Sequence, residues 1–118
     1  MDKASAQRLA LEWVAAWNAH DLDRILAHYA DDFELRSPAI VKVSGEPSGV
    51  LRGKGPVRAY WARALALFPD LRFELRATLL GVGSITLCYT GLQGRMVAEV
   101  MALDSDGKVL RADVYYEA

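Results

Sequence analysis

Glu99 is the residue of this sequence best suited to proton transfer. It is the only charged residue in the apolar segment 96–103, MVAEVMAL. If this segment is a strand, alternation places Glu99 on the same face as Met101. Burial against an apolar pocket would raise the pKa of this carboxyl and make it an acid or base near neutral pH. The alternative is a carboxylate paired with Arg95, Arg111 or a partner molecule, since ion pairs also perturb carboxyl groups.

Large aromatic residues are numerous for a chain of 118 residues, with three tryptophans and five tyrosines. They would suit an aromatic pocket for a flat or hydrophobic ligand, with indole N–H groups as orienting donors. The alternative is that each of them fills the core. The residues predicted to line the pocket are Trp13, Trp17, Tyr29, Ser37, Tyr60, Trp61, Met101 and Tyr116.

The other reactive residues do not form a recognisable site in the sequence. His20 and His28 are the only histidines, and neither has a second His or Cys at metal-ligand spacing. Cys88 is the single cysteine and is interpreted as a small buried apolar residue. Asp31 and Asp32 are adjacent, so their side chains point in different directions and do not make a carboxylate pair. Neither a phosphate-binding glycine loop nor a serine nucleophile elbow is present. We therefore predict no metal and no cofactor.

Composition and charge exclude several classes of function. The chain has 14 basic and 15 acidic residues and a net charge of -1, without the basic excess of a nucleic-acid or membrane-surface protein. The N-terminal residues lack the pattern of a signal peptide, and no apolar run approaches the roughly 18 residues of a membrane span. We expect a single domain over residues 1–118, located in the cytoplasm, where a lone cysteine stays reduced.

The elements that would position these residues follow from hydrophobic periodicity. Apolar residues at helical spacing predict helices over residues 5–18, 22–29 and 56–68. Alternating apolar and polar residues predict strands over residues 33–37, 71–80, 84–90, 95–103 and 108–116. Between the first strand and the third helix, residues 39–53 are interpreted as a long flap that contains a short strand or hairpin.

This order of elements predicts an α+β domain with its helices on one face of a mainly antiparallel sheet. Segments 84–90 and 95–103 are apolar on both faces, whereas a sheet with one solvated face would carry polar residues there. A second copy of the chain would cover that outer face, so we predict a homodimer through the sheet. Asp113 is placed on the outer face together with Arg111 and Tyr115.

Several motifs resemble the nuclear transport factor 2-like superfamily, and more narrowly its SnoaL-like and ketosteroid isomerase branch. They are residues 13–23 (WVAAWNAHDLD), 29–33 (YADDF), 37–38 (SP) and 53–61 (GKGPVRAYW). The resemblance implies a cone-shaped, cystatin-like fold, with three N-terminal helices packed on a curved, mainly antiparallel sheet. It also implies a pocket between helices and sheet, and often a dimer through the outer sheet face. This scaffold carries isomerases, cyclases, hydrolases, dehydratases and non-catalytic binders, so the resemblance does not determine the function.

The resemblance also allows the ketosteroid isomerase pattern to be compared position by position. The oxyanion-binding tyrosine of that family corresponds to Trp13, its aspartate base to Ser37, and its supporting tyrosine to Trp61. Its second, protonated aspartate corresponds to Glu99. Ser37 cannot abstract a carbon-bound proton unaided, and Trp13 offers an N–H without the acidity of a phenol. Isomerisation by that mechanism is therefore not expected.

Three functions remain open from the sequence. One is a small enzyme, such as an isomerase, cyclase or hydrolase, that uses Glu99 for acid–base chemistry on a hydrophobic or aromatic compound. In that case Ser37 and the tryptophans would position the substrate. The second is a non-catalytic ligand-binding domain, and the third is a dimeric interaction module without a ligand. A single titratable group favours binding or simple proton transfer over multistep catalysis.

Overall fold

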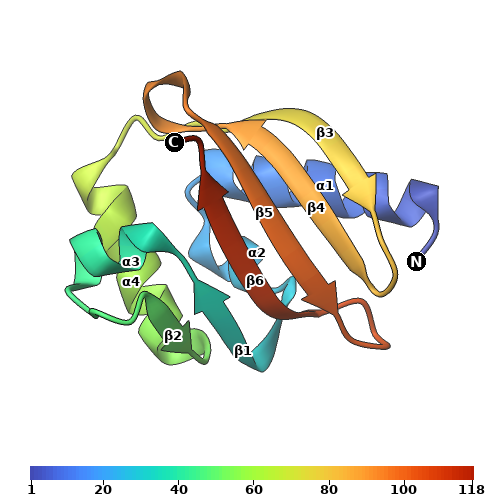
Figure 1. The fold of residues 1–118 in the computed structure, drawn as a ribbon, viewed down its shortest axis with the longest axis horizontal. Coiled ribbons are helices and arrows are strands. Elements are labelled where there is room, and N and C mark those ends of the chain that lie inside the picture. Colours follow the sequence, from blue (N-terminus) through green and yellow to red (C-terminus); the bar gives the residue numbers. More distant parts are fainter.

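The computed structural model describes all 118 residues, which form a six-stranded sheet with helices packed on one side (Figure 1). The elements in chain order are α1 (Lys3–Asn18), α2 (Leu22–Leu26), β1 (Tyr29–Arg36), α3 (Pro38–Ser44), β2 (Val50–Arg52), α4 (Lys54–Leu67), β3 (Glu74–Leu80), β4 (Ser84–Thr90), the 3₁₀ turn η1 (Leu92–Gly94), β5 (Met96–Leu103) and β6 (Val109–Tyr116). The strand order is β2-β1-β6-β5-β4-β3, and only β1 and β6 are parallel. The structure is therefore the expected α+β fold, with a mixed sheet.

Helices α1, α2 and α3 start at residues whose side chains cap the free amides of the first turn. Asp2 accepts from the backbone amide of Ser5 at 2.8 Å, and Ser37 caps α3 through the amide of Ala39 at 3.2 Å. Asp21 caps α2 in the same way, by accepting from the backbone amide of Arg24. None of the helices combines the length and apolar composition needed to cross a bilayer.

Residues 39–53 differ from the predicted flap. The expected short strand is present as β2, but α3 was not predicted, so the chain has four helices rather than three. The predicted strand 33–37 ends directly before Pro38. A proline in the first turn after a serine cap is also a typical helix start, because its missing amide costs no hydrogen bond there. Gly45, with a left-handed φ of 77°, ends this helix.

The four predicted C-terminal strands are all present and form an antiparallel meander, and β4 has the predicted bounds. The largest difference is in β1, which begins at Tyr29 and shortens the preceding helix to Leu26. Tyr29 pairs with Val109 of β6, so long-range strand pairing overrides the local helical pattern at this point.

The core lies between the inner face of the sheet and helices α1, α2 and α4. It contains 22 buried hydrophobic residues, among them Trp13, Ile25, Phe33, Leu87 and Val57. Figure 1 shows α1 and α2 passing behind the sheet, while no helix covers the face of β3–β6 that is turned toward the viewer. This outer face is therefore open in the single chain.

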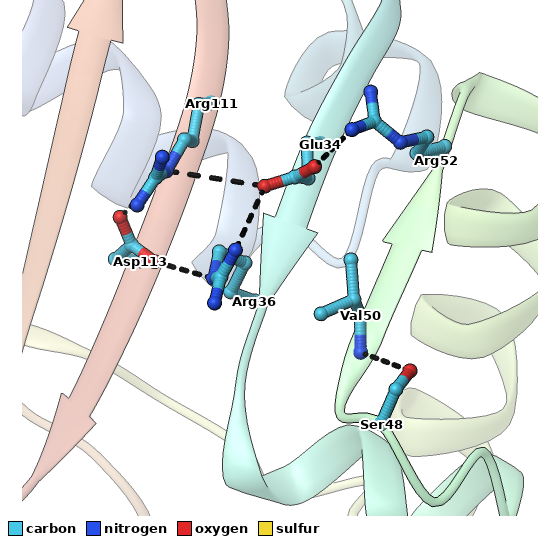
Figure 2. A network of polar contacts seen from close by, with 7 residues as sticks. All are labelled: Glu34, Arg36, Ser48, Val50, Arg52, Arg111 and Asp113. Atoms are coloured by element: carbon cyan, nitrogen blue, oxygen red, sulfur yellow. Dashed lines mark hydrogen bonds and ion pairs between the residues drawn. The ribbon is translucent and has the colours of Figure 1, made fainter.

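One edge of the outer face carries an ion-pair network on β1, β2 and β6 (Figure 2). Glu34 lies between Arg52, Arg36 and Arg111. Asp113 completes the network through Arg111 at 2.9 Å and Arg36 at 3.2 Å. The placement of Asp113 and Arg111 on the outer face is thus confirmed, and Arg111 is not a partner of Glu99.

Candidate functional site

A cavity of about 550 Å³ lies between the inner sheet face and helices α1, α3 and α4. Sixteen of its 24 lining residues are hydrophobic, so its interior suits an apolar body of drug-like size. Its lining residues come from α1, the end of β1, α3, α4, β4, η1, β5, β6 and the C-terminal residues. The cavity is thus formed by segments from both ends of the chain.

The structure brings together most of the residues that the sequence assigned to the pocket. The cavity wall includes Trp17, Ser37, Tyr60, Trp61, Glu99 and Tyr116. Trp13, Tyr29 and Met101 are not on the wall but lie in the core, each 1% exposed or less. Phe73 and Tyr89 line the cavity and pack against Trp13 with ring centroids 5.7 and 5.3 Å away, so Trp13 contacts the wall without being part of it.

The indole N–H of Trp13 is already engaged inside the core. It donates a 2.9 Å hydrogen bond to the hydroxyl of Tyr29. The resemblance matched Trp13 to an oxyanion donor, but this N–H is not free to bind a ligand. Met101 lies two residues beyond Glu99 on β5, and the wall includes Val97 and Glu99 of that strand but not Met101. The cavity therefore ends at Glu99.

Glu99 is a buried carboxyl, 5% exposed, on the cavity wall. Its Oε1 accepts a 2.7 Å hydrogen bond from the hydroxyl of Tyr89 on the neighbouring strand. Burial raises the pKa of Glu99 to about 7, and the hydrogen bond from Tyr89 acts in the opposite direction. The alternative of an ion pair does not hold within the chain, because Arg95 donates to the backbone oxygen of Glu117 and Arg111 pairs with Asp113.

The second carboxylate oxygen of Glu99 faces the ligand space. Only two fully buried side-chain polar atoms lack a hydrogen bond in this structure, Nε1 of Trp17 and Nε2 of His28. Oε2 of Glu99 has no hydrogen-bond partner either, so it must be accessible, and the side of Glu99 that is open is the cavity. A ligand in the cavity can therefore exchange a hydrogen bond or a proton with Oε2.

Besides Tyr89, three residues with hydroxyl groups share the cavity wall with Glu99, namely Ser37, Tyr60 and Tyr116. Burial is the main cause that raises the pKa of Tyr60 and of Tyr116. The Ser37 hydroxyl lowers both pKa values by a smaller amount, and the negative charge of Glu99 raises both by less again. Both phenols therefore stay protonated at neutral pH and act as hydrogen-bond donors. The Ser37 hydroxyl therefore lies beside both phenols, and both phenols lie within reach of the charge of Glu99.

Sequence reasoning missed Tyr89, the hydrogen-bond partner of the Glu99 carboxyl. Tyr89 pairs with Val97, and Glu99 pairs with Leu87. Tyr89 and Glu99 are therefore diagonal neighbours on one face of the sheet, which is within reach of a long side chain. Predicting this contact from the sequence requires the register between segments 84–90 and 95–103, which strand assignment alone does not provide.

The remaining reactive residues lie away from the cavity. Nε2 of His20 lies 2.8 Å from the backbone oxygen of Leu71, and His28 lies 3.7 Å from Glu12. Cys88 is half-buried on the outer sheet face, opposite Ala98. His, Cys, Asp and Glu side chains do not gather in groups of three that could hold a metal ion.

Comparisons with known proteins agree with this architecture. The model of the SnoaL-like domain family matches residues 10–112. A SnoaL-like protein of unknown function from Burkholderia thailandensis is 52% identical, with a TM-score of 0.94 over 99% of this chain and 98% of that one. A protein with a cystatin-like fold from Methylobium petroleophilum has a TM-score of 0.79 at 16% identity, over 100% of this chain and 79% of that one.

A further solved structure with this fold contains an organic compound. TerC, co-crystallised with polyporic acid, has a TM-score of 0.75 at 16% identity, over 95% of this chain and 91% of that one. No curated protein matches the chain.

Proposed function

The chain belongs to the SnoaL-like domain family, and on that basis we propose that it binds a hydrophobic or aromatic small molecule in its cavity and exchanges a proton with it through Glu99. The observation that carries the proposal is the free Oε2 of a buried carboxyl, with a pKa of about 7, on an apolar cavity wall. A reaction of the isomerase, cyclase or hydrolase type would use such a group. The complex of TerC with polyporic acid supports an organic ligand for this fold.

The hydrogen bond from Tyr89 determines which oxygen of Glu99 carries the proton. Because Oε1 accepts from the Tyr89 hydroxyl, the proton is taken up and released at Oε2. In its charged form, Glu99 would remove a proton from an acidic C–H or O–H group of the ligand. In its neutral form, Glu99 would donate that proton to an oxygen or carbon of the ligand.

The neighbouring hydroxyl groups give the cavity a means to stabilise the product of proton removal. Tyr60 and Tyr116 remain donors at neutral pH, and the hydroxyl of Ser37 can donate while its oxygen accepts from the amide of Ala39. Donors fixed near an apolar site stabilise negative charge that develops on a ligand oxygen. Unlike in the ketosteroid isomerase pattern, the base in this arrangement lies on β5.

The same cavity would also serve a non-catalytic binder, and one observation favours this second function. Glu99 is the only buried charged side chain of the protein, so no second buried charged group assists it. The two functions therefore differ in one measurable property. In an enzyme, Glu99 makes the bound ligand exchange protons faster than the same compound does in buffer alone, whereas a non-catalytic binder does not.

The proposal is tested by measuring how fast the C–H groups next to the carbonyl of a ketone ligand exchange hydrogen for deuterium in the presence of the protein. Quenching of tryptophan fluorescence would first select binders from a panel of naphthols, flavonoids and aryl ketones. Deuterium incorporation next to the carbonyl in D₂O would then be followed by NMR. We expect the wild type to accelerate exchange, and Glu99→Gln to reduce it about 100-fold or more while affinity changes little.

Glu74→Gln, an exposed glutamate on β3, is the matched control and should leave the exchange rate unchanged. Binding without accelerated exchange for any compound would favour the non-catalytic function. No binding across the panel would contradict both and favour an interaction module.

We also propose that a second copy of the chain packs on the outer sheet face. Ala98, Val100 and Ala102 of β5 lie on that face, together with Cys88 of β4, and all four are half-buried with no element of the chain above them. Apolar side chains on an uncovered sheet face are typical of an interface. This surface lies opposite the cavity, so dimer formation would leave the ligand site open.

A further inference from the structure

We infer that the ligand of this cavity is an organic anion, whose carboxylate, sulfonate or phenolate group is bound at the mouth by Lys42 and Arg95. This inference rests on the proposed ligand-binding function and specifies the chemical class of the ligand. The apolar body of the ligand would then extend inward toward Glu99.

The two basic residues reach the cavity from distant parts of the chain. Lys42 lies in the last turn of α3, and Arg95 lies between η1 and β5. Both side chains line the cavity and both residues are exposed, which places them at its mouth. In Figure 1, α3 and the connection between β4 and β5 lie on the same side of the molecule, near the C-terminus.

Neither cation is neutralised by the protein. No carboxylate lies within 4.0 Å of Lys42 or Arg95, whereas Arg24, Arg58 and Arg111, for example, each have an acidic partner. Two basic groups without acidic partners on the wall of one cavity attract an anion. Lys42 also suits the C-terminal end of the α3 dipole, but that effect does not account for Arg95.

Arg95 is held in place by contacts that leave donors free. One terminal nitrogen donates to the backbone oxygen of Glu117 at 3.0 Å, and the guanidinium lies 5.1 Å from the ring centre of Tyr116. Tyr116 also lines the cavity, so this packing positions the guanidinium on the wall. An arginine has five N–H donors, and the remaining ones can bind an anion. Glu117 and the terminal carboxylate of Ala118 also line the cavity, but neither lies within 4.0 Å of Lys42 or Arg95. Oε1 of Glu117 is turned to the sheet, where it accepts from the amide of Met96 at 3.1 Å.

The interior of the cavity would reject the charged group of such a ligand. Leu35, Phe73 and Val97 form apolar wall, and an unpaired charge there would be costly. The negative form of Glu99 would add repulsion. The cavity thus has two cations without acidic partners at its mouth, an apolar middle and a carboxyl at its inner end, which orients an amphiphilic acid with its anionic group outward.

Two dyes that share one aromatic body test this inference. 1-Anilinonaphthalene-8-sulfonate carries a sulfonate, and N-phenyl-1-naphthylamine lacks it. We expect the wild type to bind the sulfonate dye about tenfold more tightly in a fluorescence titration at 50 mM salt. That preference should shrink at 500 mM salt, because screening weakens exposed charge pairs. Affinity for the neutral dye should not depend on salt.

Two double variants with the same change in net charge distinguish an effect of the cations at the mouth from an effect of the overall charge of the protein. Lys42→Met combined with Arg95→Met should lower affinity for the sulfonate dye about tenfold and leave the neutral dye unchanged. Lys3→Met combined with Arg63→Met removes two exposed, unpaired cations away from the cavity and should change neither affinity. Ala64→Trp fills the cavity from α4 and should abolish binding of both dyes.

The possible outcomes distinguish this inference from the proposed function. Equal affinity for the two dyes, or an equal loss of both in the Lys42 and Arg95 variant, would overturn the anionic-ligand inference and leave the ligand cavity standing. Sulfonate binding that persists in Ala64→Trp would overturn it too, because the anion would then bind elsewhere. Absence of binding by either dye would count against both proposals.

Discussion

Tyr89 and Glu99 meet on the inner face of the sheet, where the phenol donates a 2.7 Å hydrogen bond to Oε1 of the carboxyl. The two residues lie on adjacent antiparallel strands and are diagonal neighbours in the register. Tyr89 is 3% exposed and Glu99 is 5% exposed, so the contact is shielded from bulk water. Since one carboxyl oxygen is held in this way, the other is the atom that a ligand in the cavity can reach.

Replacing Tyr89 by phenylalanine should raise the pKa of Glu99 further. The hydrogen bond from the phenol favours the charged carboxylate and opposes the effect of burial, so its removal leaves burial alone. Carbon-13 NMR of the Glu99 carboxyl across a pH titration measures the change. Tyr115→Phe, which removes an exposed hydroxyl on the outer face, is the control. A pKa that stays at about 7 in Tyr89→Phe would show that the hydrogen bond has no such role.

Glu99→Gln should become more stable relative to the wild type as the pH rises from 5 to 8. The pKa of Glu99 is raised from 4.5 to about 7 on folding, so the folded state binds more protons than the unfolded state in this range. The stability of the wild type associated with Glu99 is therefore present below about pH 4.5 and lost as the pH rises to 7. The corresponding free energy is about 3 kcal/mol.

Urea denaturation of both proteins at several pH values measures this difference, and subtracting the two curves removes the contribution of every other titrating group. For the control Glu74→Gln, the free energy of unfolding relative to the wild type should not rise between pH 5 and 8. A constant difference between the wild type and Glu99→Gln would mean that Glu99 titrates normally in the folded protein.

Trp13 and Trp17 should respond differently to replacement by phenylalanine. Trp13 donates to Tyr29 at 2.9 Å, so Trp13→Phe leaves a buried hydroxyl without its partner, at about 1–3 kcal/mol in addition to the loss of packing. The N–H of Trp17 has no hydrogen-bond partner, so Trp17→Phe should cost less.

A double-mutant cycle of Trp13→Phe with Tyr29→Phe, measured by chemical denaturation, would isolate the hydrogen bond. We expect a coupling of about 1 kcal/mol. Additive effects of the two substitutions, or a larger loss for Trp17→Phe than for Trp13→Phe, would contradict this assignment of the two indoles.

Local patterns in the sequence were sufficient to find Glu99 and the tryptophans, but not to decide which of them face the cavity. Alternation along β5 placed Glu99 among inward-facing residues, since a strand has only two faces. Trp13 and Trp17 lie four residues apart on the same stripe of α1, so helical periodicity cannot separate them. Both indoles pack against Phe73, but Trp13 donates to Tyr29 in the core whereas Trp17 lines the cavity, and these are contacts between distant segments.

Two other features depended on long-range structure. Helix α3 has only seven residues, too few to establish a helical repeat, and its start at Pro38 also fitted the end of a strand. Lys42 and Arg95 lie on one cavity only because the sheet brings α3 close to the turn before β5. Nothing in the local sequence of either residue indicates this proximity.

Val100→Lys on the outer sheet face should convert the proposed dimer into a monomer. Val100 is half-buried at the middle of β5, between Thr86 and Asp113 on the neighbouring strands. In a dimer through this face, the charged ammonium group of the lysine would lose its hydration, which would destabilise the dimer by several kcal/mol per protein copy. In a single chain the same lysine would extend into solvent, with an effect on stability within about 1 kcal/mol.

Light scattering after gel filtration at 10–100 μM measures the oligomeric state. We expect the wild type at twice the chain mass of 13.0 kDa, and Val100→Lys at the mass of one chain. Leu11→Lys, at an exposed leucine on α1 away from the sheet face, should remain a dimer. Binding of the neutral dye should persist in Val100→Lys, because the cavity lies on the opposite side of the sheet. A wild type that elutes as a single chain throughout this range would refute the dimer through this face.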